Sequence, residues 1–319
     1  MGHAFSQAVA IFGGKGGVGK STWAAELAAT AAAGHGWKVL LIEADPQGNQ
    51  WRQFGLNKSD GRAMLDALMS GDPLPREHGR DNLDVALCGE AMFDFVLELR
   101  KQQIVASITQ ETDPITPADA WHRALAPIAN EYQLIVFDCP PGEKYLVQSA
   151  FSVCSGVVGT TTPYDEAGID GLELVYARMD GSGNEHIKLL GVGLFGVSKQ
   201  KGHEFFEANA REALGIMLNG DAPVFESTIR LNLTAASDHR SRSLLSGELE
   251  REAQAATKRR LSALRQSRKA RKTGETIDLT DASAPRTSAK IAAELATDHH
   301  NLSTEVLEAL TAHLQGVNA

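Results

Sequence analysis

The segment GGKGGVGKST, residues 13–22, constrains this chain more than any other stretch. It satisfies the pattern G-x-x-x-x-G-K-[ST], whose glycines let backbone N–H groups approach phosphate oxygens closely. An apolar, β-prone run, AVAIFGG, precedes it, and the alanine-rich run STWAAELAATAAA follows it. Strand, glycine loop and helix are the arrangement that a phosphate-binding loop requires, and the helix N-terminus adds the positive end of its dipole. The segment therefore predicts a P-loop nucleotide site.

The loop residues have separate expected contacts. We expect Lys20 to contact the β- and γ-phosphates of ATP, the Ser21 hydroxyl to ligate Mg²⁺, and Thr22 to reach the α-phosphate. The residues expected to bind the nucleotide are Gly14, Lys15, Gly16, Gly17, Val18, Gly19, Lys20, Ser21 and Thr22. Lys15 is an extra lysine that the pattern does not demand.

Two further apolar runs end in acidic residues. The runs KVLLIEADPQGNQ (38–50) and YQLIVFDCPPG (132–142) are continuous and apolar, as strands buried on both faces of a parallel sheet are. Glu43, Asp45 and Asp138 then emerge at strand C-termini, where doubly wound sheets bind their ligands. We expect Asp138 and Glu43 to hold the Mg²⁺ hydration shell through water, as a Walker-B Asp does. The predicted fold is α/β: a doubly wound, mostly parallel sheet with helices on both faces.

These motifs together resemble the ParA/MinD family of deviant Walker-A ATPases, and the ParA partition ATPases most closely. Lys15 fits the signature lysine of the family, and the resemblance runs through most of residues 7–240. The remaining matching segments are EADPQGN, FDCPPG, TTPYDEAGIDGLELV (161–175) and STIRLN (227–232).

The resemblance implies a purpose for the extra lysine. In this family the signature lysine crosses the interface of a nucleotide-sandwich homodimer and contacts the phosphates bound by the other subunit. Lys15 is thus expected to make dimerisation depend on ATP and to act like an arginine finger supplied in trans. By the same resemblance Asp45 orients or activates the attacking water, so the expected catalytic residues are Lys15, Lys20 and Asp45.

Three positions depart from the family pattern. Family members usually have Asp where this chain has Glu43, which places the carboxylate one methylene further out. The run LLGVGLFGVSKQ (189–200) lacks the asparagine that often reads adenine there. Thr234 occupies the place of a basic residue that often touches DNA. The base-reading residues and the DNA surface therefore cannot be copied from the family.

Charge is distributed unevenly along the chain. The net charge is −9, yet residues 258–272 hold eight Lys and Arg residues and no acid. Such a run can bind DNA phosphates without sequence preference, with an affinity that falls steeply with salt. The alternative is a solvated helix end. The candidate DNA contacts are Lys258, Arg259, Arg260, Arg265, Arg268 and Lys269.

We expect an ATPase domain over 1–246 and a helical C-terminal region over 247–319. That region should contain one long helix from 247, a polar linker at 273–288, and one or two short helices with apolar residues on one face. The polar side of this last part carries no Lys or Arg between 302 and 315, unlike a membrane-binding helix, so we expect it to pack on the ATPase body or on another chain.

Composition excludes other classes. No run of 18 apolar residues exists, and the three cysteines form no C-x-x-C pair, which indicates reduced thiols in a cytosol. The first predicted strand begins near residue 7, so we expect neither a secretory signal nor an N-terminal helix-turn-helix domain.

The sequence predicts a cytoplasmic, nucleoid-associated bacterial ATPase that partitions DNA with a ParB-like centromere-binding adaptor. Alternatives are a ParA-like ATPase that positions a protein complex on the nucleoid, a MinD-like membrane-bound regulator of cell division, and a metabolic or iron-sulfur ATPase of the same superfamily.

Overall fold

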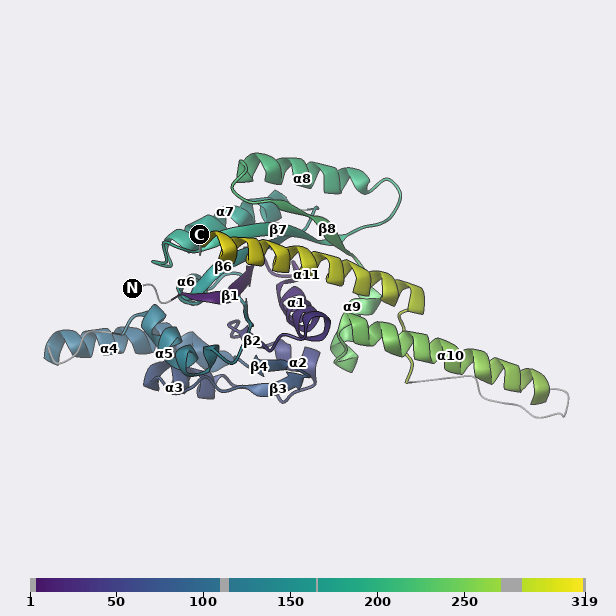
Figure 1. The fold of residues 1–319 in the computed structure, drawn as a ribbon, viewed down its shortest axis with the longest axis horizontal. Helices are drawn as coiled ribbons and strands as arrows, with labels where there is room; N and C mark the ends of the chain where they lie inside the picture. The colour runs from purple at the N-terminus through teal and green to yellow at the C-terminus, as the bar shows by residue number, and fades with distance from the viewer. Residues whose placement is uncertain (1–3, 110–114, 165, 271–282, 318–319) are drawn as a thin grey trace.

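The computed structural model describes residues 4–109, 115–164, 166–270 and 283–317, and an eight-stranded sheet lies at its centre (Figure 1). The strands are β1 (Phe5–Phe12), β2 (Val39–Glu43), β3 (Glu77–Arg80), β4 (Leu83–Ala86), β5 (Leu134–Asp138), β6 (Cys154–Thr161), β7 (Lys188–Val197) and β8 (Val224–Arg230). Their order is β3-β4-β2-β5-β1-β6-β7-β8, and the β3–β4 pair is antiparallel while the other neighbouring pairs are parallel. The predicted doubly wound, mostly parallel sheet is confirmed.

Helices cover both faces of this sheet. They are α1 (Lys20–His35), α2 (Gln50–Phe54), α3 (Arg62–Ser70), α4 (Phe95–Thr109), α5 (Pro117–Ala129), α6 (Lys144–Phe151), α7 (Glu166–Asp180), α8 (Glu204–Leu218), α9 (Leu233–Arg242), α10 (Ser246–Ala270) and α11 (Ala289–Val317), with a 3₁₀ turn, η1, at Glu90–Asp94. One hydrophobic cluster joins the sheet to α3 through α8. A second joins the opposite face to α1, α2, α9, α10 and α11.

The alternation of side chains along each strand explains the two clusters. In β1, Ala8, Ala10 and Phe12 belong to the first cluster, while Val9 and Ile11 belong to the second. Neighbouring side chains of a strand point to opposite faces, so a strand covered on both sides must be apolar throughout. This is why the central strands read as continuous apolar runs in the sequence.

The C-terminal region is part of the same body. The predicted helix from 247 is present as α10, whose distal part projects from the molecule (Figure 1). The last part of the chain is one helix of 29 residues, α11, where we expected one or two short ones. Leu302, Val306, Leu307 and Leu310 of α11 are buried in the second cluster, so this helix packs on the ATPase body as expected.

The segment between α10 and α11 is tied to α9 where the structure describes it. Arg242 donates hydrogen bonds to the carbonyl oxygens of Ser283 and Ala284. Thr287 donates from its backbone N and from Oγ1 to Asp238 Oδ2, at 2.8 and 2.7 Å. Residues 271–282, most of the predicted linker, lie outside the described residues.

Candidate functional site

The predicted phosphate-binding loop connects β1 to α1 at the sheet edge where the parallel strands end. Gly17 and Gly19 have φ angles of 81° and 83°, in the left-handed region that favours glycine. Gly19 is also crowded, because a Cβ atom there would lie 2.4 Å from the ring of Phe195. Thr160 Oγ1 donates to the carbonyl oxygen of Val18 at 2.9 Å and ties the loop to β6. The chain thus forms one glycine turn at the N-terminus of α1.

The two lysines of the loop differ in environment. Lys20 is buried, and its Nζ donates a hydrogen bond of 2.7 Å to the carbonyl oxygen of Lys15. Burial lowers the pKa of Lys20, although the charges of Asp138 and Asp45 partly oppose this. Lys15 is exposed at the surface of the loop. Lys20 therefore faces the carboxylates of its own site, whereas Lys15 lies where another molecule can approach it.

Asp138 ends β5 beneath the loop and is fully buried. Its Oδ2 accepts a hydrogen bond of 2.8 Å from Gln50 Nε2. Burial raises the pKa of Asp138 to about 6, while hydrogen bonds from Gln50 and Ser21 oppose the shift. Its Oδ1 is buried and has no hydrogen-bond partner among the residues that the structure describes. An oxygen of this kind beside the Ser21 hydroxyl suits a hard cation such as Mg²⁺.

Gln50 is a site residue that the sequence analysis missed. Its Nε2 bridges Asp138 Oδ2 and the carbonyl oxygen of Ser21, at 2.8 and 2.9 Å, so it links the Walker-B acid to the phosphate loop. Its Oε1 is buried without a partner in the described part of the chain. The sequence does contain a feature that could have indicated Gln50. This residue directly follows the DPQGN loop after an acid-terminated strand, and it is the first residue of helix α2.

The Glu43 carboxylate is engaged in hydrogen bonds with backbone N–H groups. It ends β2 opposite Asp138 of β5. Its Oε1 accepts from the backbone N atoms of Asn49 and Gln50, and its Oε2 accepts from the backbone N of Cys88 at 3.1 Å. Burial raises the pKa of Glu43 to about 8, against the effect of these hydrogen bonds. The longer side chain thus anchors the loop after β2, and a contact with the Mg²⁺ hydration shell stays a prediction.

Asp45 lies on the anchored loop and lines the same cleft as Lys20. It is mostly buried, and its Oδ1 accepts a hydrogen bond of 2.9 Å from the backbone N of Gln47. Its backbone carbonyl accepts another from the N of Gly48. These local bonds fix the direction of the turn. Asp45 is therefore held at the phosphate end of the site.

A cleft of about 650 Å³ extends from the loop across the sheet edge. This is the size of a site for a small molecule such as a nucleotide. Gly16, Gly17, Gly19, Lys20, Ser21 and Thr22 line one end. Further lining residues are Phe195 and Gly196 of β7, Ile229 and Arg230 of β8, Leu231 and Asn232 of the following turn, Leu233, Ala236, His239 and Arg240 of α9, and Leu295 and His299 of α11. The predicted STIRLN segment is thus part of the cleft.

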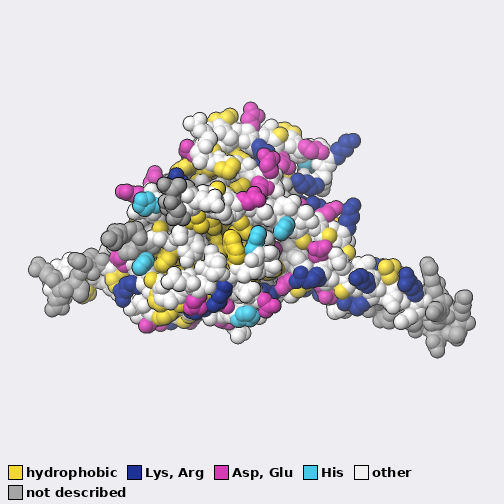
Figure 2. All heavy atoms as spheres, in the orientation of Figure 1, with side chains coloured by type: hydrophobic (Ala, Val, Ile, Leu, Met, Phe, Trp, Pro, Cys, Tyr) yellow, Lys and Arg dark blue, Asp and Glu magenta, His cyan; other side chains and the backbone are white. Residues whose placement is uncertain are grey.

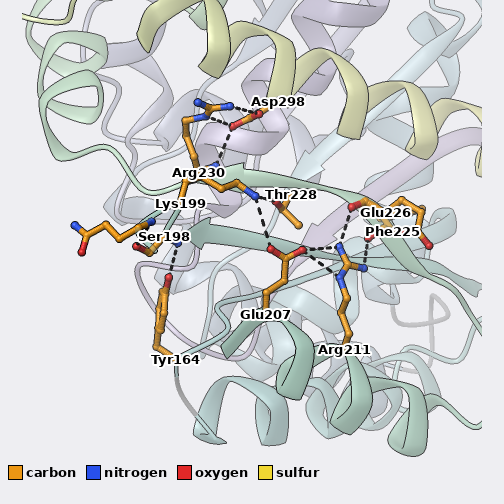
Figure 3. A network of polar contacts seen from close by, with 11 residues as sticks. Tyr164, Ser198, Lys199, Glu207, Arg211, Phe225, Glu226, Thr228, Arg230 and Asp298 are labelled. Carbon is orange, nitrogen blue, oxygen red and sulfur yellow. Dashed lines mark hydrogen bonds and ion pairs between the residues drawn. The ribbon is translucent and has the colours of Figure 1, made fainter. Parts of the chain in front are cut away.

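Polar contacts hold together the wall of the cleft that β8 and α11 form (Figure 3). Arg230 points to Asp298 of α11, with Nε–Oδ2 at 2.6 Å and Nη2–Oδ1 at 3.0 Å, and it also pairs with Glu294. Tyr164, which lines the cleft, accepts a hydrogen bond from the backbone N of Ser198. The end of β8 and helix α11 are therefore joined beside the cleft.

The candidate DNA contacts lie on α10. Lys258, Arg259, Arg260 and Arg265 are exposed, and Arg259 Nη2 pairs with Glu252 at 2.9 Å. Figure 2 shows basic side chains along this projecting helix. The side chains of Arg268 and Lys269, together with residues 271 and 272, lie outside what the structure describes.

Two kinds of site are absent from the described residues. None of the helices in that part of the chain is long and apolar enough to cross a membrane. Within the same residues, no three His, Cys, Asp or Glu side chains gather as a metal-binding group.

The chain is similar to a known protein family and to several known proteins. A family model described as an AAA domain matches residues 6–188. The sporulation initiation inhibitor protein Soj of Bacillus subtilis is 30% identical over 47% of this chain and 56% of its own. The chromosome partitioning protein ParA of Caulobacter vibrioides is 30% identical over 58% of this chain and 67% of its own.

Solved structures share the fold. The septum site-determining protein MinD of Pyrococcus horikoshii, complexed with Mg-ADP, has a TM-score of 0.55 and 17% identity, over 75% of this chain and 86% of that one. At this identity the likeness concerns the fold alone. The chain spans about half the length of several of the curated relatives it matches.

Proposed function

Because the chain belongs to the ParA/MinD family of P-loop ATPases, we propose that it is a ParA-like ATPase that dimerises on binding ATP and positions DNA cargo. One observation carries the proposal: of the two loop lysines, one is buried among the carboxylates of its own site and the other is exposed. A single-subunit ATPase needs only the first. The exposed Lys15 fits a contact across an interface with a second nucleotide-bound subunit.

Within one subunit, the phosphates lie against the glycine turn and Lys20. The backbone N–H groups and the α1 N-terminus supply positive potential to them. The oxygens of Ser21 and Asp138 suit Mg²⁺, which would be held directly by Ser21 and through water by Asp138. When bound, the ion neutralises phosphate charge as the terminal phosphoryl group is transferred. Asp45, fixed by its local hydrogen bonds, orients the attacking water.

The dimer is proposed to bind DNA without sequence preference through α10. Four exposed basic residues of this helix lie on a part that projects away from the body, while the chain as a whole is acidic. A local basic arm can release counterions from DNA even where the net charge is negative. The cycle then works in the cytoplasm, on the nucleoid, with a ParB-like centromere-binding adaptor that stimulates slow hydrolysis.

Dimerisation is tested by light scattering with ATP and Mg²⁺, with ADP, and without nucleotide. The wild type should be dimeric only with ATP. Lys20→Ala should lose nucleotide binding, whereas Lys15→Ala should keep binding and lose the dimer. Lys58→Ala, at an exposed lysine outside the loop, is the matched control and should behave as wild type. A Lys15→Ala protein that still dimerises with ATP would refute the role proposed for Lys15.

DNA binding is tested with a random-sequence duplex in the same three nucleotide states and at two salt concentrations. Binding should require ATP. Alanine at Lys258, Arg259, Arg260 and Arg265 should lower the slope of log affinity against log salt by about 3 to 4, because each phosphate contact contributes about 0.9. A control variant with alanine at Lys58, Arg62, Lys101 and Lys290, all exposed elsewhere, should keep the wild-type slope.

If DNA is bound in no nucleotide state, DNA is not the surface on which this protein works. The same measurement would then be repeated with anionic lipid vesicles, which a MinD-like regulator binds. An ATPase that ignores both surfaces and turns over faster with a small substrate would be a metabolic member of the superfamily.

A further inference from the structure

Two exposed arginines line the cleft and have no part in the proposed function. Arg52 lies in the last turn of α2, and Arg240 lies in the last turn of α9. The nearby Arg80, in contrast, is paired with Glu248 at 2.6 Å. Among the residues that the structure describes, neither Arg52 nor Arg240 has a carboxylate partner. Their guanidinium groups are therefore available to an anionic group of another molecule.

The two helices that carry these arginines are joined at their C-terminal ends. Arg80 Nη1 donates to the carbonyl oxygen of Phe54, the last residue of α2, at 3.1 Å. Its Nη2 donates to the carbonyl oxygen of Ser243, the residue that caps α9, at 2.9 Å. The guanidinium of Arg52 is further restrained because it lies over the ring of Trp51, 5.0 Å from its centroid. Both arginines are thus presented on one connected wall of the cleft.

Exposed apolar side chains lie on the same wall. Leu231 and Leu233 line the cleft and are 54% and 76% exposed. Leu233, Ala236 and Arg240 are spaced i, i+3 and i+7 along α9, so they share one face of this helix, and all three line the cleft. That face is therefore an apolar strip that ends in a cation. Apolar side chains exposed together beside a cleft are typical of an interaction site.

We propose that Arg52, Leu231, Leu233, Ala236 and Arg240, together the α2–α9 surface, bind a peptide segment of a partner protein that carries acidic and apolar side chains. The two guanidinium groups are complementary in charge to aspartate and glutamate, which they can bind through paired hydrogen bonds. The leucines favour a peptide over a nucleic acid backbone, because they offer neither charge nor a hydrogen bond to phosphate. The proposed function requires none of these five side chains, so the inference goes beyond it.

Random peptides displayed on phage and selected on the full chain, with ATP and Mg²⁺ and again without nucleotide, test this surface. Selected peptides should contain Asp or Glu beside Leu, Ile or Phe. Fluorescence anisotropy should show that Arg52→Ala/Arg240→Ala weakens their binding about 10-fold, because two exposed ion pairs are lost. Arg62→Ala/Arg100→Ala is the matched control, since both arginines are exposed and Arg100 also lies over an aromatic ring, that of Tyr145.

Several results would overturn the proposal. The first is a selection without acidic peptides, or equal peptide affinity in wild type and Arg52→Ala/Arg240→Ala. Weaker ATP binding by this variant would assign the arginines to the nucleotide, and loss of its ATP-dependent dimer in light scattering would assign them to the second subunit. Loss of duplex DNA binding with peptide binding unchanged would assign them to nucleic acid. A wild type that binds the peptides but never ATP would refute the proposed function and leave the α2–α9 surface standing.

Discussion

At the scale of single residues, the phosphate end of the cleft is organised by polar side chains that are not all satisfied. Asp138 and Gln50 bond to each other, yet each keeps one buried oxygen that has no partner within the described residues. Each such atom costs about 1–3 kcal/mol, so folding alone does not favour them. The proposed Mg²⁺ and its water ligands would supply the bonds that these atoms lack.

Gln50 should act as a positioning residue for Asp138 and Ser21. Gln50→Leu removes the two hydrogen bonds that its amide donates to Asp138 Oδ2 and the Ser21 carbonyl. Partners of this kind around a metal site are worth about 10–100-fold, so we expect ATP turnover to fall by at least about 10-fold, with a higher Mg²⁺ requirement. Steady-state hydrolysis measured against Mg²⁺ concentration checks this. Gln103→Leu, on the exposed side of α4, is the control, and equal turnover in the two variants would contradict the role.

The protonation of His299 should appear in the pH dependence of stability. The ring is buried facing Glu26 of α1, His239 of α9 and Asp298 of α11, and burial lowers its pKa from the usual value near 6.5. Below pH 6.5 the unfolded chain therefore binds a proton at this histidine more readily than the folded chain does. The free energy of unfolding that is present above pH 6.5 is lost as the pH falls below it. His299→Leu should remove up to about 1.4 kcal/mol of this loss per pH unit.

Urea unfolding at pH 7, 6 and 5 measures this slope. His300→Leu should retain the wild-type slope because that side chain is exposed. Identical slopes in wild type and His299→Leu would show that the folded ring accepts the proton as readily as the unfolded one.

At the scale of elements, the end of β8 and helix α11 act as one unit. Arg230 gives Asp298 a bidentate ion pair, with side chains 21% and 13% exposed, and Glu305 accepts from the N–H groups of the edge strand. A protected edge strand does not pair with other chains, so the helix also limits aggregation. The same contacts place His299 and Leu295 in the wall of the cleft.

Asp298→Ala should loosen this unit. The substitution removes three acceptor contacts and leaves the half-buried Arg230 guanidinium with Glu294 as its remaining ion-pair partner among the described residues. We expect the free energy of unfolding to fall by about 1.5–3 kcal/mol, the range for hydrogen bonds to charged groups. Chemical denaturation of Asp298→Ala and of Glu308→Ala, which changes an exposed acid on the same helix, makes the comparison. A loss below about 0.5 kcal/mol would mean that the pair is screened as a surface pair is.

Sequence reasoning reached the elements whose local pattern is strong. The glycine loop, the buried strands ending at Glu43 and Asp138, and the long helix from 247 are each specified by residues close together in the chain. Contacts between segments that are distant in the chain could not be predicted from the sequence. Neither the bridge from Gln50 to Asp138, 88 residues apart, nor the pair of Phe195 with His299 leaves a periodic signal. The use of Glu43 to anchor backbone likewise depends on where Cys88 lies in space.

At the scale of the whole molecule, the chain closes its core with its last helix. Trp23 of α1 and Val9 and Ile11 of β1 are buried in one cluster with Ala292, Leu302 and other residues of α11. Residues after 246 therefore share the hydrophobic core of the preceding part of the chain. The projecting part of α10 leaves the body between two anchored points, the Glu26–Ser246 hydrogen bonds at its start and the Asp238–Thr287 bonds after it. This arrangement lets a basic arm extend without loosening the core.

A chain that ends at residue 288 should therefore fail to fold. It lacks Leu295, Leu302, Val306, Leu307 and Leu310, all buried against the sheet and α1. Burial of each such side chain stabilises the fold by about 1.5–3 kcal/mol, so the loss is roughly 8–15 kcal/mol, which equals the whole stability of a typical domain. Size-exclusion chromatography and thermal unfolding followed by circular dichroism should show aggregation and no cooperative transition.

The control chain ends at residue 315 and keeps every one of these buried side chains, so it should unfold cooperatively near the wild-type temperature. If the chain that ends at 288 also unfolds cooperatively at that temperature, the ATPase body is complete without α11. The cleft would then lose one wall and keep its phosphate end, and nucleotide binding by the shortened chain would measure what α11 contributes.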